Sequence, residues 1–220
     1  MYSYYNIAMQ KYDTYIFDLD GTITDTMTVW LGILRDALLY FNFTPPDDRE
    51  LAWYSHDWKQ LRKIGFPEDK FDAFAAYIYG LANSRLPVAN FHNGAYEMLE
   101  RLKNKRKKIG IFSSMDRAMF EPAMTGRNLY ALTDAAIAGD DLPNRKPKPD
   151  GILKVLRDLK VSSTSAVYIG DKDTDIETAQ NAGIDSILYF PVAHSVIYNL
   201  SDLKKHNPTL IITDWRELVV

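Results

Sequence analysis

Short apolar runs alternate with helical patterns over most of this 220-residue chain, and this alternation constrains its fold more than any other feature. Each run has the length of a buried strand and is bounded by turn or helix signals. The runs are Thr14–Leu19, Ile109–Phe112, Ala135–Ala138, Ala166–Ile169, Ser186–Tyr189 and Leu210–Ile212. Strands that alternate with helices favour a parallel sheet covered on both faces. We therefore expect an α/β fold with a Rossmann-like, doubly wound parallel sheet.

One segment, residues 27–87, breaks this rhythm because it contains no convincing strand pattern. It predicts three helices, at Met27–Phe41, Asp47–Ile64 and Pro67–Ser84, separated by prolines and by Gly65. We interpret it as a helical module inserted after the first strand. Residues 1–26 and 88–220 would then form the α/β core.

Two core helices carry capping signals. Asp150 is a candidate N-cap for a helix whose apolar face holds Ile152, Leu153, Leu156 and Leu159. Gly183 is a candidate C-terminal cap for the helix that contains Ile176, Ala179 and Ala182.

Composition narrows the classes of function. The absence of cysteine excludes disulfides, thiolate metal sites and cysteine nucleophiles. A net charge of -3 gives no indication of a nucleic-acid or anionic-membrane partner. No apolar stretch approaches the length of a membrane span, and Met1–Lys11 lacks the pattern of a secretory signal. We expect a cytoplasmic protein, with a short Tyr-rich extension before the first strand and a solvated basic run at 103–108.

The first chemical motif is Asp18-Leu19-Asp20-Gly21-Thr22, at the end of the first apolar run. Residues two apart face the same side of an extended segment, so both carboxylates should leave the strand toward one site. Ligands bind at this end of open α/β sheets. Two nearby carboxylates can divide the work, one ionised as a nucleophile or metal ligand and one protonated as an acid. Alone, the pair could equally be two solvated acids at a strand end.

The second motif is Ser113-Ser114, directly after the run Ile109–Phe112. A hydroxyl and free backbone N–H groups at a strand end suit a phosphate oxygen. The alternative is a helix N-cap before Met115, which explains Ser114 as well as a functional role does. Ser113 is the better candidate for binding phosphate.

The last two motifs follow later strands. Arg145-Lys146-Pro147-Lys148-Pro149 predicts a rigid, extended turn, in which a fixed ammonium can neutralise a phosphoryl group and a carboxylate together. Gly170-Asp171-Lys172-Asp173-Thr174-Asp175 gathers acids that suit a hard divalent cation. Helix capping by Asp173 or Thr174 explains part of this cluster. Asp171 and Asp175 remain as candidates.

Together these motifs resemble the haloacid dehalogenase superfamily, on its phosphatase side. The resemblance is most specific at Asp18–Thr22, Lys146–Pro149 and Gly170–Asp175. Residues 144–150 and Asn93-Gly94 further resemble phosphoglycolate-phosphatase-like members, and β-phosphoglucomutase-like members form a neighbouring branch. The chain departs from many relatives at Ser114, where they carry Asn.

The resemblance implies a role for each motif. Asp18 would be the nucleophile and Asp20 the general acid and base, while Ser113, Ser114 and Lys146 would hold the phosphate. Mg²⁺ would be bound by Asp18, the backbone carbonyl of Asp20 and Asp171, with Asp175 supporting it from behind. The helical insertion resembles the cap of this family. Its aromatic residues could line a pocket for a flat or apolar leaving group, although burial within the module explains most of them.

The implied function is a Mg²⁺-dependent phosphatase that hydrolyses a small phosphorylated metabolite through an aspartyl phosphate, as a monomer or homodimer. A phosphosugar mutase resembling β-phosphoglucomutase would use the same Asp18 and Asp20. A dehalogenase proper lacks an acid at the position of Asp20 and needs no metal, so Asp20 argues against it. A non-catalytic binding protein on this fold should have lost part of the catalytic set, which is present here.

Overall fold

The computed structural model of this chain describes residues 11–56 and 58–219, without the side chains of residues 55 and 56. Most of the Tyr-rich extension, with Tyr2, Tyr4 and Tyr5, lies outside the described residues. Tyr12 lies inside them and is buried, and its hydroxyl donates to Asp185 Oδ2 at 2.8 Å.

The core is a six-stranded sheet in the order β3-β2-β1-β4-β5-β6, and every pair of neighbours is parallel. The strands are β1 (Thr14–Phe17), β2 (Lys108–Phe112), β3 (Ala135–Ile137), β4 (Ala166–Gly170), β5 (Asp185–Tyr189) and β6 (Leu210–Ile212). Each predicted run forms a strand. This order is that of a doubly wound sheet, so the predicted fold class is confirmed.

Successive side chains of the central strands enter two separate cores, one on each face of the sheet. Tyr15 and Phe17 of β1 pack in one cluster with α5 (Ala95–Asn104) and α6 (Arg117–Gly126). Ile16 lies in the other cluster with α7 (Asp150–Leu159) and α8 (Asp173–Asn181). The period-two alternation of a strand thus explains why these short runs are apolar throughout.

The N-terminus of α7 differs from the sequence prediction by one residue. Asp150 is the first helical residue, Pro149 occupies the cap position, and the Asp150 carboxylate accepts a hydrogen bond from Asn144 Nδ2 at 2.9 Å. Leu153 is 37% exposed, and Val155 takes its predicted place in the buried face. At the end of α8, Gly183 follows the helix with φ 69, as expected of a C-terminal glycine.

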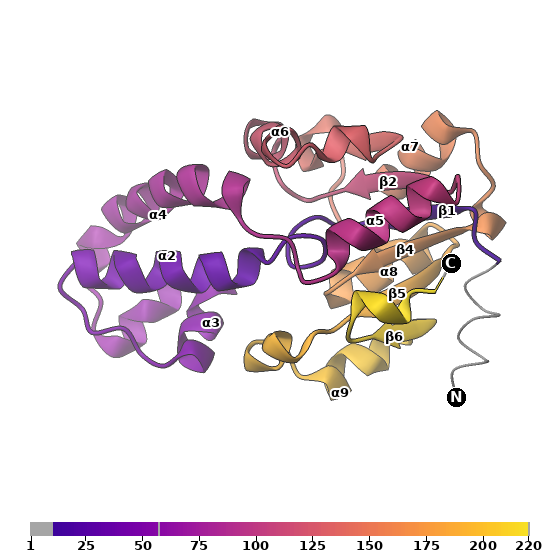
Figure 1. The fold of residues 1–220 in the computed structure, drawn as a ribbon. Coiled ribbons are helices and arrows are strands. Elements are labelled where there is room, and N and C mark those ends of the chain that lie inside the picture. The colour runs from indigo at the N-terminus through magenta and orange to yellow at the C-terminus, as the bar shows by residue number, and fades with distance from the viewer. Residues whose placement is uncertain (1–10, 57, 220) are drawn as a thin grey trace.

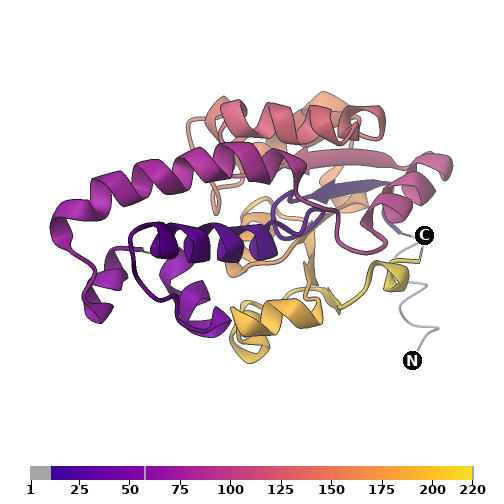
Figure 2. The ribbon, with the colours of Figure 1, turned by 60° about the vertical axis from the view of Figure 1, so that its left-hand side comes forward.

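The inserted segment forms a helical module (residues 26–88) with its own apolar core, set to one side of the sheet (Figures 1 and 2). It comprises α2 (Thr26–Tyr40), α3 (Asp48–His56) and α4 (Phe71–Arg85), with short 3-10 helices at Trp58–Ile64, Glu68–Lys70 and Leu86–Val88. The single helix predicted at Asp47–Ile64 is therefore wrong. Its second half winds more tightly, and this places Leu61 in the module core and Trp58 against Tyr79.

The basic run at 103–108 lies at the end of α5 and is paired with surface acids. Lys107 Nζ lies 2.8 Å from Asp13 Oδ1, and Lys103 and Lys108 lie 3.4 and 3.7 Å from Asp134 Oδ1. Lys103 and Lys105 lie at the end of α5, as predicted for a helix end, whereas Lys107 is only 19% exposed and Lys108 begins β2. Within the described part of the chain, no helix combines the length and apolar character needed to cross a bilayer.

Arg127, the C-cap residue of α6, binds the segment that leads from the helical module back to the core. Its guanidinium donates to the carbonyl oxygens of Leu86 and Ala89 at 2.7 Å and to that of Ala123 at 3.0 Å. Leu86 and Ala89 belong to the segment that leads from the module back to the core, and both are buried. One planar fork of donors therefore fixes the position of this segment.

We expect Arg127→Met to lower the free energy of unfolding by about 2–3 kcal/mol, because it leaves buried carbonyl oxygens without a charged donor. Urea denaturation monitored by circular dichroism measures this. The matched control is Arg216→Met, whose side chain is 79% exposed and pairs with Asp214 on the surface. It should leave the urea midpoint of unfolding close to that of the wild type. Equal stability of the two variants would contradict the role of Arg127.

Candidate active site

Asp18 is the first residue after β1, at the carboxyl end of a central strand between β2 and β4. Its backbone N–H continues the ladder by donating to the carbonyl of Ile169 at 2.8 Å. The side chain is only 7% exposed. A carboxylate in this position needs a cationic partner, because burial of an unpaired charge is costly.

Lys146 is that partner. Its Nζ lies 2.8 Å from Asp18 Oδ1 and 2.8 Å from Asp175 Oδ1, and its side chain is 4% exposed. The sequence predicts an extended, rigid turn here. Residues 146 and 147 do form a turn, but the backbone of Pro149 is helical rather than extended. Burial alone would lower the pKa of Lys146, but the carboxylates of Asp175 and Asp18 raise it, so it is held as a cation.

Asp175 lies in the first turn of α8 and accepts four hydrogen bonds. Oδ2 accepts from the backbone N–H groups of Asp171 and Lys172, both at 3.1 Å. Oδ1 accepts from Lys146 Nζ and from the hydroxyl of Tyr168 at 3.3 Å. Lys172 is the N-cap residue of this helix, and the Asp175 carboxylate accepts from its backbone N–H. The predicted N-caps, Asp173 and Thr174, are instead the first two helical residues, so that prediction is wrong.

Asp171 follows β4 and is fully buried. Its Oδ1 accepts from the Thr22 hydroxyl at 3.3 Å, whereas Oδ2 has no hydrogen-bond partner. Gly21, with φ 77, leaves the space in front of it, because a Cβ there would lie 2.7 Å from Asp171 Oδ2. The Nδ1 of buried His194 is 3.8 Å from the same oxygen.

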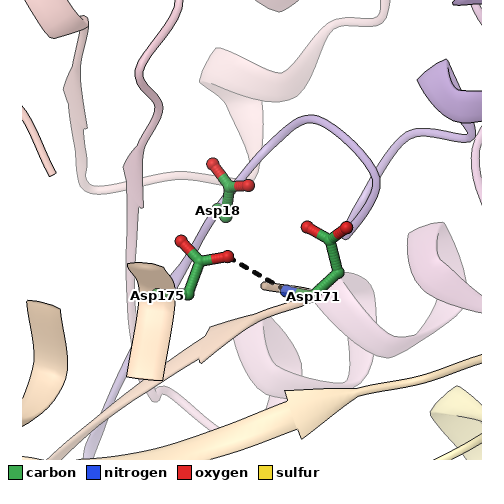
Figure 3. Close-up of side chains that lie close together, drawn as sticks. All are labelled: Asp18, Asp171 and Asp175. Carbon is green, nitrogen blue, oxygen red and sulfur yellow. Dashed lines mark hydrogen bonds between the residues drawn. The ribbon is translucent and has the colours of Figure 1, made fainter. Parts of the chain in front are cut away.

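Three carboxylates thus gather at the strand ends, those of Asp18, Asp171 and Asp175 (Figure 3). One oxygen of each lies within 4.8 Å of the others. Hard divalent cations such as Mg²⁺ prefer oxygen ligands of this kind. The buried Asp171 Oδ2, which lacks a donor, fits a cation ligand better than a structural hydrogen-bond acceptor. The residues present therefore fit the metal that the sequence resemblance implies.

Asp20 and the two serines complete the set predicted from the sequence. Ser113 is buried after β2, donates to Asp20 Oδ2 at 3.3 Å and accepts from the Met115 N–H at 3.0 Å. Ser114 is exposed, and its carbonyl accepts from Arg145 Nη1 at 2.9 Å. Burial raises the pKa of Asp20, although Lys172, the Ser113 hydroxyl, Lys146 and Arg127 oppose it, so this carboxyl keeps its proton to a higher pH than an ordinary aspartate does.

A cavity of about 270 Å³ brings these side chains together. Its walls include Asp18, Asp20, Ser113, Ser114, Lys146 and Asp175. Asp171 lines an adjoining cavity of about 350 Å³, which also reaches Asp20. Every site residue predicted from the sequence therefore lines one of two neighbouring cavities. Their individual roles stay predictions.

Comparison with known proteins supplies the family. Residues 15–189 match the family model described as haloacid dehalogenase-like hydrolase. The chain belongs to this family.

Named relatives agree with this assignment. The phosphoglycolate phosphatase of Rhodobacter capsulatus is 29% identical over 185 residues, covering 79% of this chain and 82% of the relative. The validoxylamine A 7'-phosphate phosphatase of Streptomyces hygroscopicus subsp. limoneus is 28% identical over 183 residues, covering 79% and 83%. The predicted enzyme class, a phosphatase of this family, is confirmed.

Solved structures agree on the fold. A haloacid dehalogenase family hydrolase from Deinococcus radiodurans R1, solved with bound phosphate and sodium, superposes with a TM-score of 0.80. It is 18% identical and covers 94% of this chain and 93% of its own. At this identity the similarity concerns the fold alone.

Sequence reasoning missed three side chains of this hydrolase site. Lys172 lines both cavities, and although burial alone would lower its pKa, Asp171 and the other neighbouring groups raise it. Thr22 holds Asp171, and Tyr168 donates to both the Phe112 carbonyl and Asp175. Lys172 and Thr22 stand inside the motifs that were recognised, so their position was a usable signal. Nothing in the sequence distinguishes Tyr168 from the other residues of its strand.

We expect the metal-free hydrolase to lose stability as the pH rises from 6.5 to 8.5. Burial raises the pKa of Asp18 to about 7 and that of Asp171 to about 8, against an ordinary value of 3.8. In this window the unfolded chain has lost protons that the folded protein still holds, so the free energy of unfolding falls with rising pH. Thermal melts in chelator at several pH values measure this. Asp171→Asn should show a flatter profile, and an equally steep one would contradict the assignment.

Proposed function

We propose that this enzyme is a Mg²⁺-dependent phosphatase that hydrolyses a small phosphomonoester through a covalent aspartyl phosphate on Asp18. One observation carries the proposal: the buried Asp18 carboxylate faces a cavity lined by Asp20 and Ser113, with the Lys146 ammonium 2.8 Å away. A nucleophile, a proton carrier and an anion-binding cation are the parts that this reaction requires. Phosphatases among the relatives support the same activity.

In the first half-reaction, an oxygen of Asp18 attacks phosphorus and the bond from phosphorus to the leaving oxygen breaks. The proton on Asp20 passes to that oxygen, so an alcohol departs rather than an alkoxide. The raised pKa of Asp20 supports this assignment, since an acid must hold its proton until the bond breaks. Lys146 and the Ser113 hydroxyl bind the non-bridging oxygens of the phosphoryl group.

In the second half-reaction, water attacks the phosphorus of the aspartyl phosphate. Asp20, now ionised, takes a proton from that water, and the bond from phosphorus to Asp18 breaks. Inorganic phosphate leaves, and the nucleophile is restored. Covalent catalysis of this kind divides one difficult displacement into two easier ones.

Asp18, the backbone carbonyl of Asp20 and Asp171 would hold the Mg²⁺ ion. When bound, it supplies positive charge that screens the phosphoryl group from the nucleophile and from neighbouring carboxylates. Asp175 acts behind them by orienting Lys146 and the 171–172 backbone, since both of its oxygens are already engaged.

The helical module, at residues 27–87 by the sequence boundaries, would serve as a cap over the site. Trp30 from α2 and Leu86 reach the catalytic cavity from the module. A cap of this kind excludes water and contacts the leaving group. The cytoplasmic location, the monomeric or homodimeric state and the absence of a nucleic-acid partner stay predictions.

The test is phosphate release from a panel of phosphomonoesters, each measured with Mg²⁺ and with chelator. We expect turnover with Mg²⁺ and its loss, by at least about a hundredfold, with chelator. Restoration by added Mg²⁺ excludes irreversible damage. Conversion of a hexose 1-phosphate to its 6-phosphate without free phosphate would indicate the mutase instead. Folded protein that binds Mg²⁺ but releases phosphate from no member of the panel would refute the proposal.

A further inference from the structure

The cavity of about 350 Å³ beside the catalytic one is placed to receive the leaving group. The two cavities share Asp20, Trp30, Met119 and Lys172 in their walls. Asp20 is the proposed acid, so the oxygen that it protonates lies at this shared boundary. The part of a substrate beyond that oxygen then extends into the larger cavity.

The wall of this cavity has a charged part and a largely apolar part. Its charged side chains, Asp20, Asp171 and Lys172, belong to the catalytic motifs. The other described residues of the wall are apolar or aromatic, apart from Thr26, Gly21 and the tyrosine hydroxyls: Met27, Trp30, Leu31, Trp58, Tyr79, Met119, Ile197 and Tyr198. Those from the helical module carry no charge.

Two of the module side chains form a packed aromatic pair at this wall. Trp58 and Tyr79 meet edge to face, with ring centroids 5.7 Å apart and planes at 83°. Tyr79 is nevertheless 50% exposed, and Trp30 and Trp58 are partly exposed. Burial within the module therefore does not account for the whole of these side chains. Exposed aromatic faces around a concave space are typical of sites for flat or apolar ligands.

The charges in the wall of this cavity disfavour an anionic leaving group. A carboxylate or a second phosphate placed among these side chains would lose its hydration, and the described wall offers no cation outside the catalytic motifs. Lys172, the cation in this wall, lies among acids, with Asp171 its strongest neighbour. A neutral leaving group meets no such penalty.

We infer that the enzyme's leaving group is a neutral alcohol that bears a ring or a hydrocarbon face, and not a small anion such as glycolate or phosphate. The inference rests on the proposed phosphatase function and names the substrate class of that same site. Trp30, Trp58 and Tyr79 determine the specificity by contacting the ring.

The first experiment compares kcat/KM for benzyl phosphate, phosphoglycolate and pyrophosphate under identical Mg²⁺ conditions. Benzyl phosphate has a neutral, unactivated leaving group, so a high rate reports binding of the ring rather than an easy bond cleavage. We expect kcat/KM for benzyl phosphate to exceed that for phosphoglycolate at least tenfold. Binding of benzylphosphonate and phosphonoacetate, which cannot turn over in this way, should follow the same order by calorimetry.

The second experiment substitutes aromatic residues in the wall of the leaving-group cavity. Trp30→Leu and Tyr79→Leu should each lower kcat/KM for benzyl phosphate about tenfold while changing that for methyl phosphate less than threefold, because methyl phosphate has no ring. The matched control is Trp53→Leu. Trp53 belongs to the same module and is 60% exposed, but it lines a different cavity. It should leave both values unchanged.

The outcomes separate the inference from the proposed function. Faster hydrolysis of phosphoglycolate or pyrophosphate than of benzyl phosphate, lost in Asp18→Asn, would overturn the inference and keep the phosphatase. Equal losses on benzyl and methyl phosphate in the Trp30 and Tyr79 variants would also overturn it. Release of phosphate from none of these compounds would remove the proposed function, and the inference with it.

Discussion

Replacement of Asp18 by asparagine should abolish turnover, lowering kcat by roughly four orders of magnitude or more, as removal of a covalent nucleophile does in other enzymes. The amide nitrogen and oxygen of asparagine fill the same space but do not attack phosphorus. The covalent intermediate therefore cannot form at this position. Single-turnover assays use a substrate with the radioactive label in its phosphoryl group. They should show label retained on the acid-quenched wild-type protein and none on the variant.

The fold should survive this change. Asp18 is a buried acid whose pKa is raised to about 7, so its charge opposes folding at higher pH. Lys146 keeps its contact with Asp175 when Asp18 is lost as a partner. We expect the metal-free variant at pH 8 to melt at or above the wild-type temperature. Asp158→Asn, at an exposed ion pair on α7, is the matched control and should keep full activity. Substantial phosphatase activity in Asp18→Asn would refute the nucleophile assignment.

Replacement of Lys146 by methionine should reduce both activity and stability. It removes the ammonium that lies 2.8 Å from both Asp18 Oδ1 and Asp175 Oδ1, and it leaves two buried carboxylates beside a side chain that cannot pair with them. Loss of one partner from a buried ion pair typically lowers the free energy of unfolding by about 3–5 kcal/mol. Loss of a charge that stabilises the transition state lowers kcat by roughly a hundredfold to a thousandfold.

A pH series distinguishes this mechanism from simple misfolding. Protonation of Asp18, whose pKa is raised by burial to about 7, removes one of the two unpaired charges, so Lys146→Met should regain part of its stability as the pH is lowered from 8 to 5. Denaturant titrations at each pH measure the difference from wild type. Lys148→Met, an exposed residue in the same turn, should match wild type in both assays. A stability deficit that is independent of pH would contradict the ion-pair explanation.

The fold was largely predictable because its signals are local. Each strand is a short apolar run, and residues such as Ile16 and Phe17 are apolar because both faces of a parallel sheet are covered. The helical module was predictable for the opposite reason, since it lacks such runs. The break at Trp58 was not, because the winding there follows contacts with Tyr79 and the module core, which lie far along the chain.

The sequence by itself determined which groups stand at the strand ends, because polar residues that directly follow buried strands must lie at the edge of the sheet. Asp18, Ser113 and Asp171 follow β1, β2 and β4, which are neighbours in a parallel sheet, so topology alone brings them to one edge. Lys146 and Asp175 lie outside any strand, so sheet topology alone did not predict their approach to Asp18 and to each other.

Only the tertiary structure decided how these groups are paired and what surrounds them. It joins Lys146 to two carboxylates, gives Asp175 four donors and leaves one oxygen of Asp171 without any. It also turns some aromatic side chains of the module toward a cavity and others, such as Phe74, into its core. The physical reason is that burial, hydrogen-bond distance and pKa depend on atoms from distant parts of the chain, whereas strand and helix patterns depend on neighbours in sequence.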